Sequence, residues 1–167
     1  MRINIDLNNY ENLLKLKAGD SCLLNGIIYT ARDAAHKRLD QLIKNGEKLP
    51  FDMKDFNVYY AGPTPAKEGE IIGSCGPTTS ARMDKFTPYF ISLGQRVMIG
   101  KGERSDEVIE ACKKYKAVYF CATGGAGALL SLSVKSSEVI AFPELGCESI
   151  KKMTIENFPV VVGIDTK

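Results

Sequence analysis

The chain has 167 residues, of which 44% are apolar and 25% are charged, and its formal net charge is +2 at pH 7. This length and composition predict one globular domain over residues 1–167, and so small a charge, with basic and acidic residues interleaved, argues against a nucleic-acid partner. The longest apolar runs are too short to cross a membrane and the first residues lack a signal-peptide pattern, so we expect a cytoplasmic protein with no membrane partner.

The first third of the chain is predicted to alternate between strands and helices. The expected elements are an edge strand, a short helix, a second strand and a longer helix, at residues 1–6, 8–17, 21–29 and 31–45. Asn25 and Gly26 indicate a hairpin kink inside the second strand. Thr30 is expected to cap the longer helix, and Gly46 fits the position just after its end.

The remaining two thirds predict a longer series of strands and helices. Strands are expected at residues 57–61, before residue 73, and at 95–99, 117–122, 137–142, 152–155 and 159–164. Helices are expected to begin at Pro77, after Ser105 and after the glycine-rich turn 123–127. Because strands and helices alternate from Gly73 onward, we expect a parallel sheet with right-handed crossovers. The first third is richer in hairpin-like strands, so the predicted class is α/β, part parallel and part antiparallel.

The segment Gly73–Asp84 has the most informative pattern in the chain. We expect a tight glycine loop followed by a helix, with Pro77 in the first turn, where its missing N–H costs nothing. Thr78 and Arg82 would then project from one face of that helix, beside backbone N–H groups that favour an anion. The segment therefore predicts a site for a small acidic ligand, although ordinary helix capping and a solvated arginine explain the same residues.

Two further cations follow predicted strands. Arg32 lies at the start of the helix 31–45, where a positive charge is unfavourable unless it meets an anion, and Lys101 lies between two glycines. The glycine-rich loops are expected at the carboxyl ends of the parallel strands, where such sheets bind ligands. Because arginine grips a carboxylate with two parallel hydrogen bonds, Arg32, Arg82 and Lys101 fit a substrate with two carboxylates.

Other catalytic machinery is sparse in this sequence. His36 is the one histidine, and Asp33, Asp84 or a threonine hydroxyl are the other candidate bases. The five cysteines are widely spaced, which argues against a disulfide framework and against a metal site made by this chain alone. Cys75 is more simply a small loop residue than a nucleophile, because a pair with His36 would also need an orienting group. No glycine loop has the spacing of a phosphate-binding motif, so nucleotide binding is disfavoured.

Three long motifs carry a family resemblance. They are TARDAAHKR at residues 30–38, YAGPTP at 60–65 and GSCGPTTSARMD at 73–84. Shorter matches continue in order at residues 100–102, 122–125, 142–146 and 163–166. Together they resemble the C-terminal region of class I fumarases, which also forms the β subunit of two-subunit fumarases and L(+)-tartrate dehydratases. The resemblance covers nearly the whole chain.

The resemblance implies a fold, a reaction and a partner. The fold is the swivelling β/β/α domain, with one parallel and one antiparallel sheet. The reaction is that of an oxygen-sensitive hydro-lyase, a fumarate hydratase that interconverts fumarate and L-malate. Its [4Fe-4S] cluster is bound by three cysteines of an α subunit rather than by this chain, and we expect a heterotetramer. The alternatives are the β subunit of an L(+)-tartrate dehydratase and a stand-alone dicarboxylate-binding module without chemistry.

The motif match also implies roles for single residues. Arg32, Thr78, Arg82 and Lys101 would bind the substrate, and Arg32, Thr78 and His36 are the expected catalytic set. The cations would stabilise the charge that builds up as a C–H proton leaves, while the partner's iron acts on the substrate hydroxyl. Thr78 is a candidate base or proton relay, with an aspartate of the partner as the competing assignment. His36 would orient Arg32 or relay a proton, or else be a hydrogen-bonded structural histidine.

Overall fold

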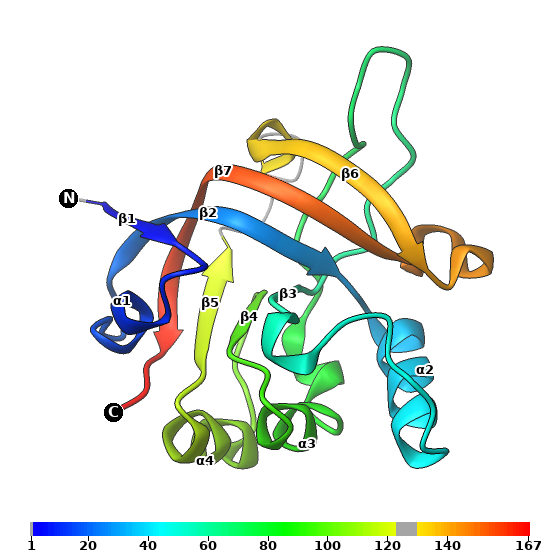
Figure 1. Ribbon diagram of the computed structural model, residues 1–167. Helices are drawn as coiled ribbons and strands as arrows, with labels where there is room; N and C mark the ends of the chain where they lie inside the picture. Colours follow the sequence, from blue (N-terminus) through cyan, green and yellow to red (C-terminus); the bar gives the residue numbers. More distant parts are fainter. Residues whose placement is uncertain (1, 123–129) are drawn as a thin grey trace.

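The computed structural model describes residues 2–122 and 130–167 (Figure 1). The turn at 123–127 and most of the helix expected after it lie outside these residues. Within the described ranges, no helix combines the length and the apolar character needed to cross a membrane.

Seven strands and four α-helices lie within the described residues. The strands are β1 (Ile3–Asp6), β2 (Ser21–Thr30), β3 (Val58–Tyr59), β4 (Val97–Gly100), β5 (Val118–Ala122), β6 (Val134–Ala141) and β7 (Ile150–Ile164). The α-helices are α1 (Tyr10–Leu14), α2 (Asp33–Lys44), α3 (Thr87–Ser92) and α4 (Asp106–Tyr115). Short 3-10 helices occur at Met53–Asp55, Ser80–Met83, Ser131–Ser133 and Pro143–Glu148.

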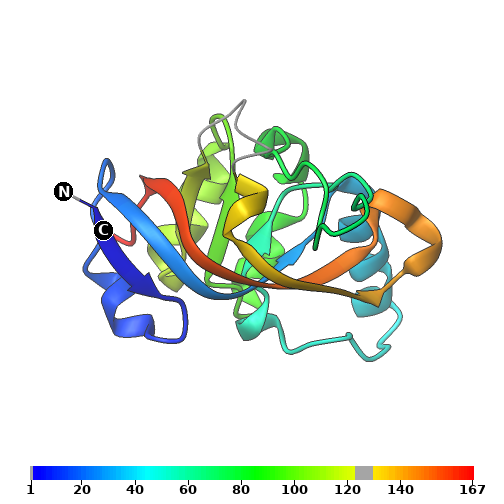
Figure 2. The same ribbon diagram turned by 90° about the horizontal axis from the view of Figure 1, so that it is seen from above.

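The seven strands form one mixed sheet. Strands β1 to β5 are parallel neighbours in chain order, and β7 pairs antiparallel with β5, β6 and β2. Because β7 pairs with both β5 and β2, the sheet curls into a partly closed barrel, and the long strands β2, β7 and β6 arch side by side over β3 to β5 (Figures 1 and 2). The predicted α/β class is confirmed. The expected division into one parallel and one antiparallel sheet is not confirmed, since strands of both kinds join through β2 and β7.

Two apolar clusters pack on the two faces of the parallel strands. Side chains of successive strand residues point to opposite faces. Tyr59 accordingly belongs to the cluster among β2, β4, β5 and β7, while its neighbours Val58 and Tyr60 belong to the cluster beneath helices α2, α3 and α4. Both faces of these strands are therefore used for packing, and the ends of the strands are left to carry polar side chains.

A bulge replaces the hairpin predicted at Asn25 and Gly26. The β2–β7 register shifts between Leu24 and Gly26, and Gly26 has a φ of +134°. The partner strand bends at the same level, where Asn157 has a φ of +53° and its N–H donates to Asn25 Oδ1 at 2.9 Å. The two strands predicted at 152–155 and 159–164 are consequently a single strand, β7. A bulge bends a strand without ending it, which lets β2 and β7 curve together.

The strand expected before Gly73 and the α-helix expected at Pro77 are both wrong. Between β3 and Ser80, the backbone is a loop, and inside it Ser74 N–H donates to Thr64 Oγ1 at 2.8 Å. Thr78 N–H donates to Tyr60 O at 2.6 Å, at the end of β3. The backbone groups that would start a helix are thus bonded elsewhere, and helical structure begins only with the 3-10 turn at Ser80–Met83.

Candidate active site

Three neighbouring strand ends bring the predicted substrate-binding residues to one edge of the sheet. Arg32 follows β2, Lys101 follows β4, and Thr78 is bonded to Tyr60 just after β3. Because β2, β3 and β4 are adjacent and parallel, their carboxyl ends lie together, which is where open α/β sheets bind ligands. Thr78 is half-buried, and its hydroxyl makes no hydrogen bond to the described residues.

Arg32 occupies the N-cap position of α2 and makes no side-chain cap. The cap predicted for Thr30 is therefore wrong, and Thr30 Oγ1 instead accepts a hydrogen bond from the backbone of β7. The carboxylate of Glu148 caps the start of α2 instead, because its Oε1 accepts from Ala34 N–H at 3.3 Å. The same oxygen lies 4.0 Å from Arg32 Nε. Arg32 Nε is buried and makes no hydrogen bond to the described residues. The arginine thus keeps an unsatisfied donor beside the helix start.

Arg82 is brought to the same place by an ion pair. It lies in the 3-10 helix Ser80–Met83, and its Nη2 is 3.4 Å from Oδ1 of Asp33, the first residue of α2. Both side chains are about half exposed, at 49% and 41%. The α-helical face that was expected to carry Thr78 and Arg82 does not exist, so support for an anion comes from side chains here rather than from a helix N-terminus.

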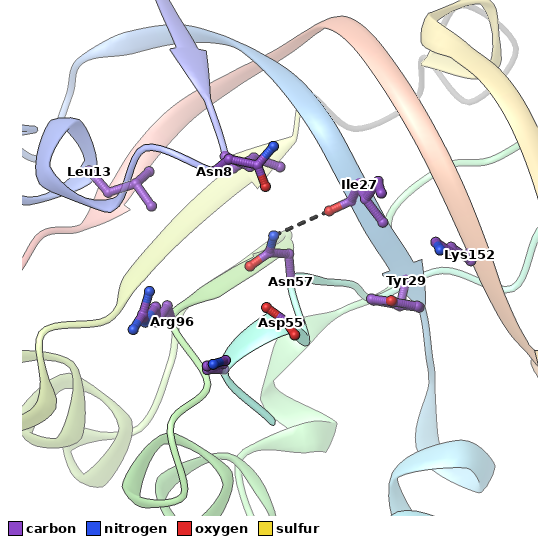
Figure 3. Close-up of a pocket in the computed structure, with 10 residues that line it drawn as sticks. Asn8, Leu13, Ile27, Tyr29, Asp55, Asn57, Arg96 and Lys152 are labelled. Atoms are coloured by element: carbon purple, nitrogen blue, oxygen red, sulfur yellow. Dashed lines mark hydrogen bonds between the residues drawn. The ribbon is translucent and has the colours of Figure 1, made fainter. Parts of the chain in front are cut away.

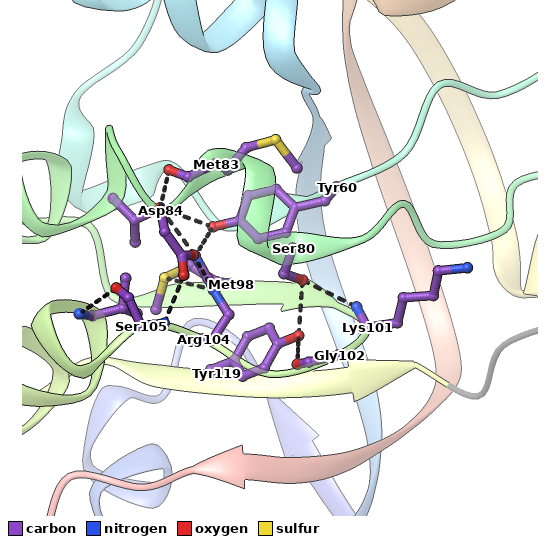
Figure 4. Close-up of polar contacts among 12 residues, drawn as sticks. Tyr60, Ser80, Met83, Asp84, Met98, Lys101, Gly102, Arg104, Ser105 and Tyr119 are labelled. Carbon is purple, nitrogen blue, oxygen red and sulfur yellow. Dashed lines mark hydrogen bonds and ion pairs between the residues drawn. The ribbon is translucent and has the colours of Figure 1, made fainter.

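The backbone of Lys101 is fixed by hydrogen bonds, whereas its ammonium group makes no ion pair with the described residues. Its N–H donates to Ser80 Oγ at 3.0 Å, its carbonyl accepts from Ser80 N–H at 2.9 Å, and Thr79 forms a parallel bridge with it. Its side chain is exposed and extends away from these contacts (Figure 4). Nζ makes no ion pair with any described residue. The backbone hydrogen bonds therefore fix the point from which the exposed Lys101 side chain extends.

Positive charge exceeds negative charge at this edge. The cations are Arg32, Arg82 and Lys101, and the carboxylates beside them are Asp33 and Glu148. Each guanidinium has one carboxylate at 3.4–4.0 Å, at or beyond hydrogen-bonding distance, so it retains capacity for a tighter anion. The arrangement can hold a small molecule by two separated carboxylates.

His36 lies behind this edge and does not reach it. The imidazole is buried, its Nδ1 is 2.8 Å from Arg32 O, and its ring stacks on Phe90 at a centroid distance of 5.7 Å. Burial lowers the pKa of His36 to about 4. The side chain is therefore neutral at pH 7 and contacts the backbone of Arg32 rather than its guanidinium.

Arg104 was missed by the sequence analysis, because Glu103-Arg104-Ser105 has the composition of an exposed loop. Its side chain is fully buried, and Nε lies 2.7 Å from Asp84 Oδ1 (Figure 4). Nη2 donates to Tyr60 Oη and to Thr87 Oγ1, both at 3.0 Å. Asp84, the last residue of the motif 73–84, was the available signal for this network.

The five cysteines lie apart from one another among the described residues. Within residues 2–122 and 130–167, no three His, Cys, Asp or Glu side chains come together as ligands for an ion. Cys22, Cys75 and Cys112 are buried in the core. Burial raises the pKa of Cys75 to about 12, which keeps its thiol protonated and unsuited to act as a nucleophile.

A separate polar hollow of about 280 Å³ lies at the opposite ends of β3 and β4 (Figure 3). Asn57 and Arg96, which directly precede these strands, line it together with Lys152 of β7. The Arg96 guanidinium stacks over the Tyr10 ring at 4.2 Å. None of the predicted site residues lines this hollow.

The family comparison covers the whole chain. The family model described as Fumarase C-terminus matches residues 1–167. The chain is 44% identical over 172 residues to "Fumarate hydratase class I, aerobic" of Escherichia coli strain K12, a match to 99% of this chain and 31% of that protein. It is 41% identical over 159 residues to "Fumarate hydratase 2" of Leishmania major, covering 94% of this chain and 28% of that protein.

A second kind of relative is matched over most of its own length. The "L(+)-tartrate dehydratase subunit beta" of Escherichia coli strain K12 is 34% identical over 161 residues, covering 93% of this chain and 79% of the subunit. The chain thus spans less than a third of the fumarate hydratases it matches and most of the tartrate dehydratase subunit.

Proposed function

The chain belongs to the Fumarase C-terminus family, and from this premise we propose that it is the β subunit of a hydro-lyase. Its reaction is the reversible hydration of fumarate to L-malate. One observation carries the proposal: the side chains of Arg32, Arg82 and Lys101 lie together at the carboxyl ends of β2, β3 and β4. This surface can grip two carboxylates and offers no metal ligands within the described residues. It therefore supports half of an active site.

In this proposal the cations bind and orient the substrate. Arg32 and Arg82 each present a guanidinium fork, which suits a carboxylate better than a lysine ammonium does. Lys101 supplies a point charge on a flexible stem from a fixed backbone position. As the substrate loses its C–H proton, negative charge grows on the neighbouring carboxylate, and fixed cations stabilise that charge more than they stabilise the ground state.

Thr78 is proposed to lie beside the reacting carbon. Its hydroxyl is free of hydrogen bonds to the described residues, so it can bond to substrate. A threonine hydroxyl is a poor base unless nearby cations lower its pKa, and an aspartate of the partner is the competing base. His36 is assigned a supporting role, because its ring packs among aromatic side chains and bonds to the carbonyl of Arg32.

The proposed partner is an α subunit that binds the [4Fe-4S] cluster of class I fumarases. The described residues of this chain do not fit such a cluster, since no group of cysteines gathers. The proposed assembly is an α–β complex, expected as a heterotetramer.

A second candidate reaction is the dehydration of L(+)-tartrate. The observation in its favour is the similarity to a tartrate dehydratase β subunit, which is 34% identical and is covered to 79%. Both substrates have two carboxylates and a hydroxyl that leaves, so the cations described above suit either.

Anaerobic assays of the reconstituted complex distinguish these candidates. The substrates are fumarate, L-malate and both enantiomers of tartrate. Turnover of malate and fumarate above that of the tartrates supports the fumarate hydratase, and preference for L(+)-tartrate supports the alternative. A complex that turns over none of them, although the chain binds malate, would point to a dicarboxylate-binding module.

A further inference from the structure

We propose that Ser80, Asp84, Arg104 and Tyr119 form a loop clamp that sets the position of Arg82 relative to Lys101. These two cations lie on different segments, which we call the site loops: residues 78–84, which include the 3-10 helix Ser80–Met83, and residues 100–105. The clamp joins the two site loops through side chains that are buried or nearly buried. Its importance for catalysis rests on the proposed function, whereas its effect on the loops does not.

An ion pair forms the first half of the loop clamp. Arg104 Nε is 2.7 Å from Asp84 Oδ1, and the other carboxylate oxygen of Asp84 accepts from Ser105 N–H at 2.6 Å. One carboxylate therefore binds both the side chain and the backbone of the opposite loop. The Arg104 guanidinium also lies over the rings of Tyr60 and Tyr119, at 5.1 and 4.7 Å from their centroids. This leaves the guanidinium little freedom to rotate.

Two hydroxyl groups form the second half of the loop clamp. Ser80 Oγ and Tyr119 Oη are 2.8 Å apart, and Tyr119 Oη donates to Gly102 O at 2.9 Å (Figure 4). Ser80 Oγ also accepts from Lys101 N–H. These hydrogen bonds therefore connect Ser80 both directly and through Tyr119 of β5 to the backbone of Lys101 and Gly102.

The close fit of the two loops requires glycine at position 100. A Cβ on Gly100 would overlap Ser80 Oγ and would lie 2.7 Å from Tyr60 Cδ2. Gly100 does not have a positive φ, so its role is the close approach rather than an unusual backbone conformation.

A buried ion pair is weak evidence for stability, because desolvation can outweigh the attraction between the charges. Arg104 is fully buried and Asp84 is 12% exposed, so this desolvation is large. Fixing one arrangement of two loops is a better explanation for the pair than added stability. Since the Arg104 side chain is buried and bonds to Asp84, Tyr60 and Thr87, we assign it as a positioning residue.

The test compares two variants that each lose one phenolic hydroxyl. Tyr119→Phe removes the bonds to Ser80 and Gly102 and keeps the ring against Arg104. Tyr10→Phe is the matched control, since Tyr10 Oη donates to a backbone carbonyl, Lys116 O, at 2.7 Å. Ser80→Ala is a second variant, because it removes the acceptor of the Lys101 N–H directly.

Amide hydrogen exchange of the full chain gives the first measurement. We expect the Lys101 amide to exchange roughly three- to tenfold faster in Tyr119→Phe and in Ser80→Ala, the effect of losing one hydrogen bond. Tyr10→Phe should leave this rate unchanged. An unchanged Lys101 rate in folded Tyr119→Phe and Ser80→Ala would overturn the loop clamp, whether or not the proposed reaction is correct.

Steady-state kinetics of the complex with the α subunit gives the second measurement. We expect Tyr119→Phe to raise KM for L-malate and also to lower kcat, so that kcat/KM falls about three- to tenfold, because misplaced cations weaken substrate binding and weaken transition-state binding further. Faster exchange at Lys101 with an unchanged KM, in a complex whose wild type is active, would overturn the link between the clamp and substrate binding. An inactive wild-type complex would instead count against the proposed function. The exchange data would still show whether the loop clamp holds the Lys101 backbone.

Discussion

Arg82 Nη2 lies 3.4 Å from Asp33 Oδ1, and both side chains are half exposed, so this pair contributes little to stability. A bound carboxylate would replace it with a closer, bidentate contact. We therefore predict that Arg82→Ala in the complex weakens transition-state binding by about 2–5 kcal/mol, which lowers kcat/KM for malate roughly 30-fold or more. Steady-state kinetics with malate measures the loss.

Arg38→Ala is the control for that measurement. Arg38 is an exposed arginine of α2, and its Nη1 is 2.8 Å from Glu144 Oε1, away from the loops of Arg82 and Lys101. Its loss should leave kcat/KM within about twofold, since a surface ion pair contributes roughly 0–1 kcal/mol. Near wild-type turnover by Arg82→Ala would contradict the carboxylate-binding role.

His36 predicts a dependence of stability on pH. Burial lowers its pKa from 6.5 to about 4 in the folded state, and the hydrogen bond to Arg32 O opposes this shift. The Arg104 charge has a smaller lowering effect, and the Asp33 charge a smaller raising one. Between these values the unfolded state binds a proton that the folded state does not, so the free energy of unfolding falls as the pH drops from 6.5 to 4. The loss should reach roughly 3 kcal/mol at pH 4.

Urea unfolding of the wild type and of His36→Phe at several pH values measures this effect. Phenylalanine fills a similar volume beside Phe90 and does not titrate, and the carboxylates common to both proteins cancel in the comparison. We expect the pH slope between 4 and 6.5 to be steeper for the wild type. Equal slopes would show that the imidazole is not held neutral.

The close packing of the two site loops predicts a cost at Gly100. Adding a methyl group there should destabilise the protein by about 1–3 kcal/mol, because buried Ser80 must move. In a double-mutant cycle, Gly100→Ala should cost less in a Ser80→Ala background, where the overlapping Oγ is absent. Urea unfolding measures the four proteins, and strictly additive costs would contradict the proposed overlap.

Elements whose signals are local could be predicted from the sequence. Ser105 was expected to cap a helix, and its hydroxyl accepts from Val108 N–H at the start of α4. Gly46 was expected after α2, and it has a φ of +69° there. Both signals depend on a few neighbouring residues, so they do not require knowledge of the rest of the fold.

Elements that depend on distant partners could not be predicted in this way. The bulge at Gly26 resembled a hairpin because its partner, Asn157, is more than a hundred residues away. Pro77 resembled a helix start, but the N–H groups of Thr78 and Ser80 donate to the carbonyls of Tyr60 and Lys101. Arg104 was overlooked for the same reason, since its carboxylate partner Asp84 lies on another loop.

For the molecule as a whole, the candidate site is an open edge rather than an enclosed cavity. Arg82 and Lys101 are exposed there, and the described residues include no metal-binding group. The chain also spans less than a third of the fumarate hydratases it matches. The exposure of these two cations is the feature on which the proposed partner would close.

The most direct test of this account is malate turnover under anaerobic conditions by the chain alone, by the α subunit alone and by the complex. We predict fumarate formation by the complex and none by either subunit separately, because the carboxylate-binding cations and the iron–sulfur cluster are proposed to lie on different chains. Formation of fumarate by this chain alone, free of partner and iron, would contradict the half-site.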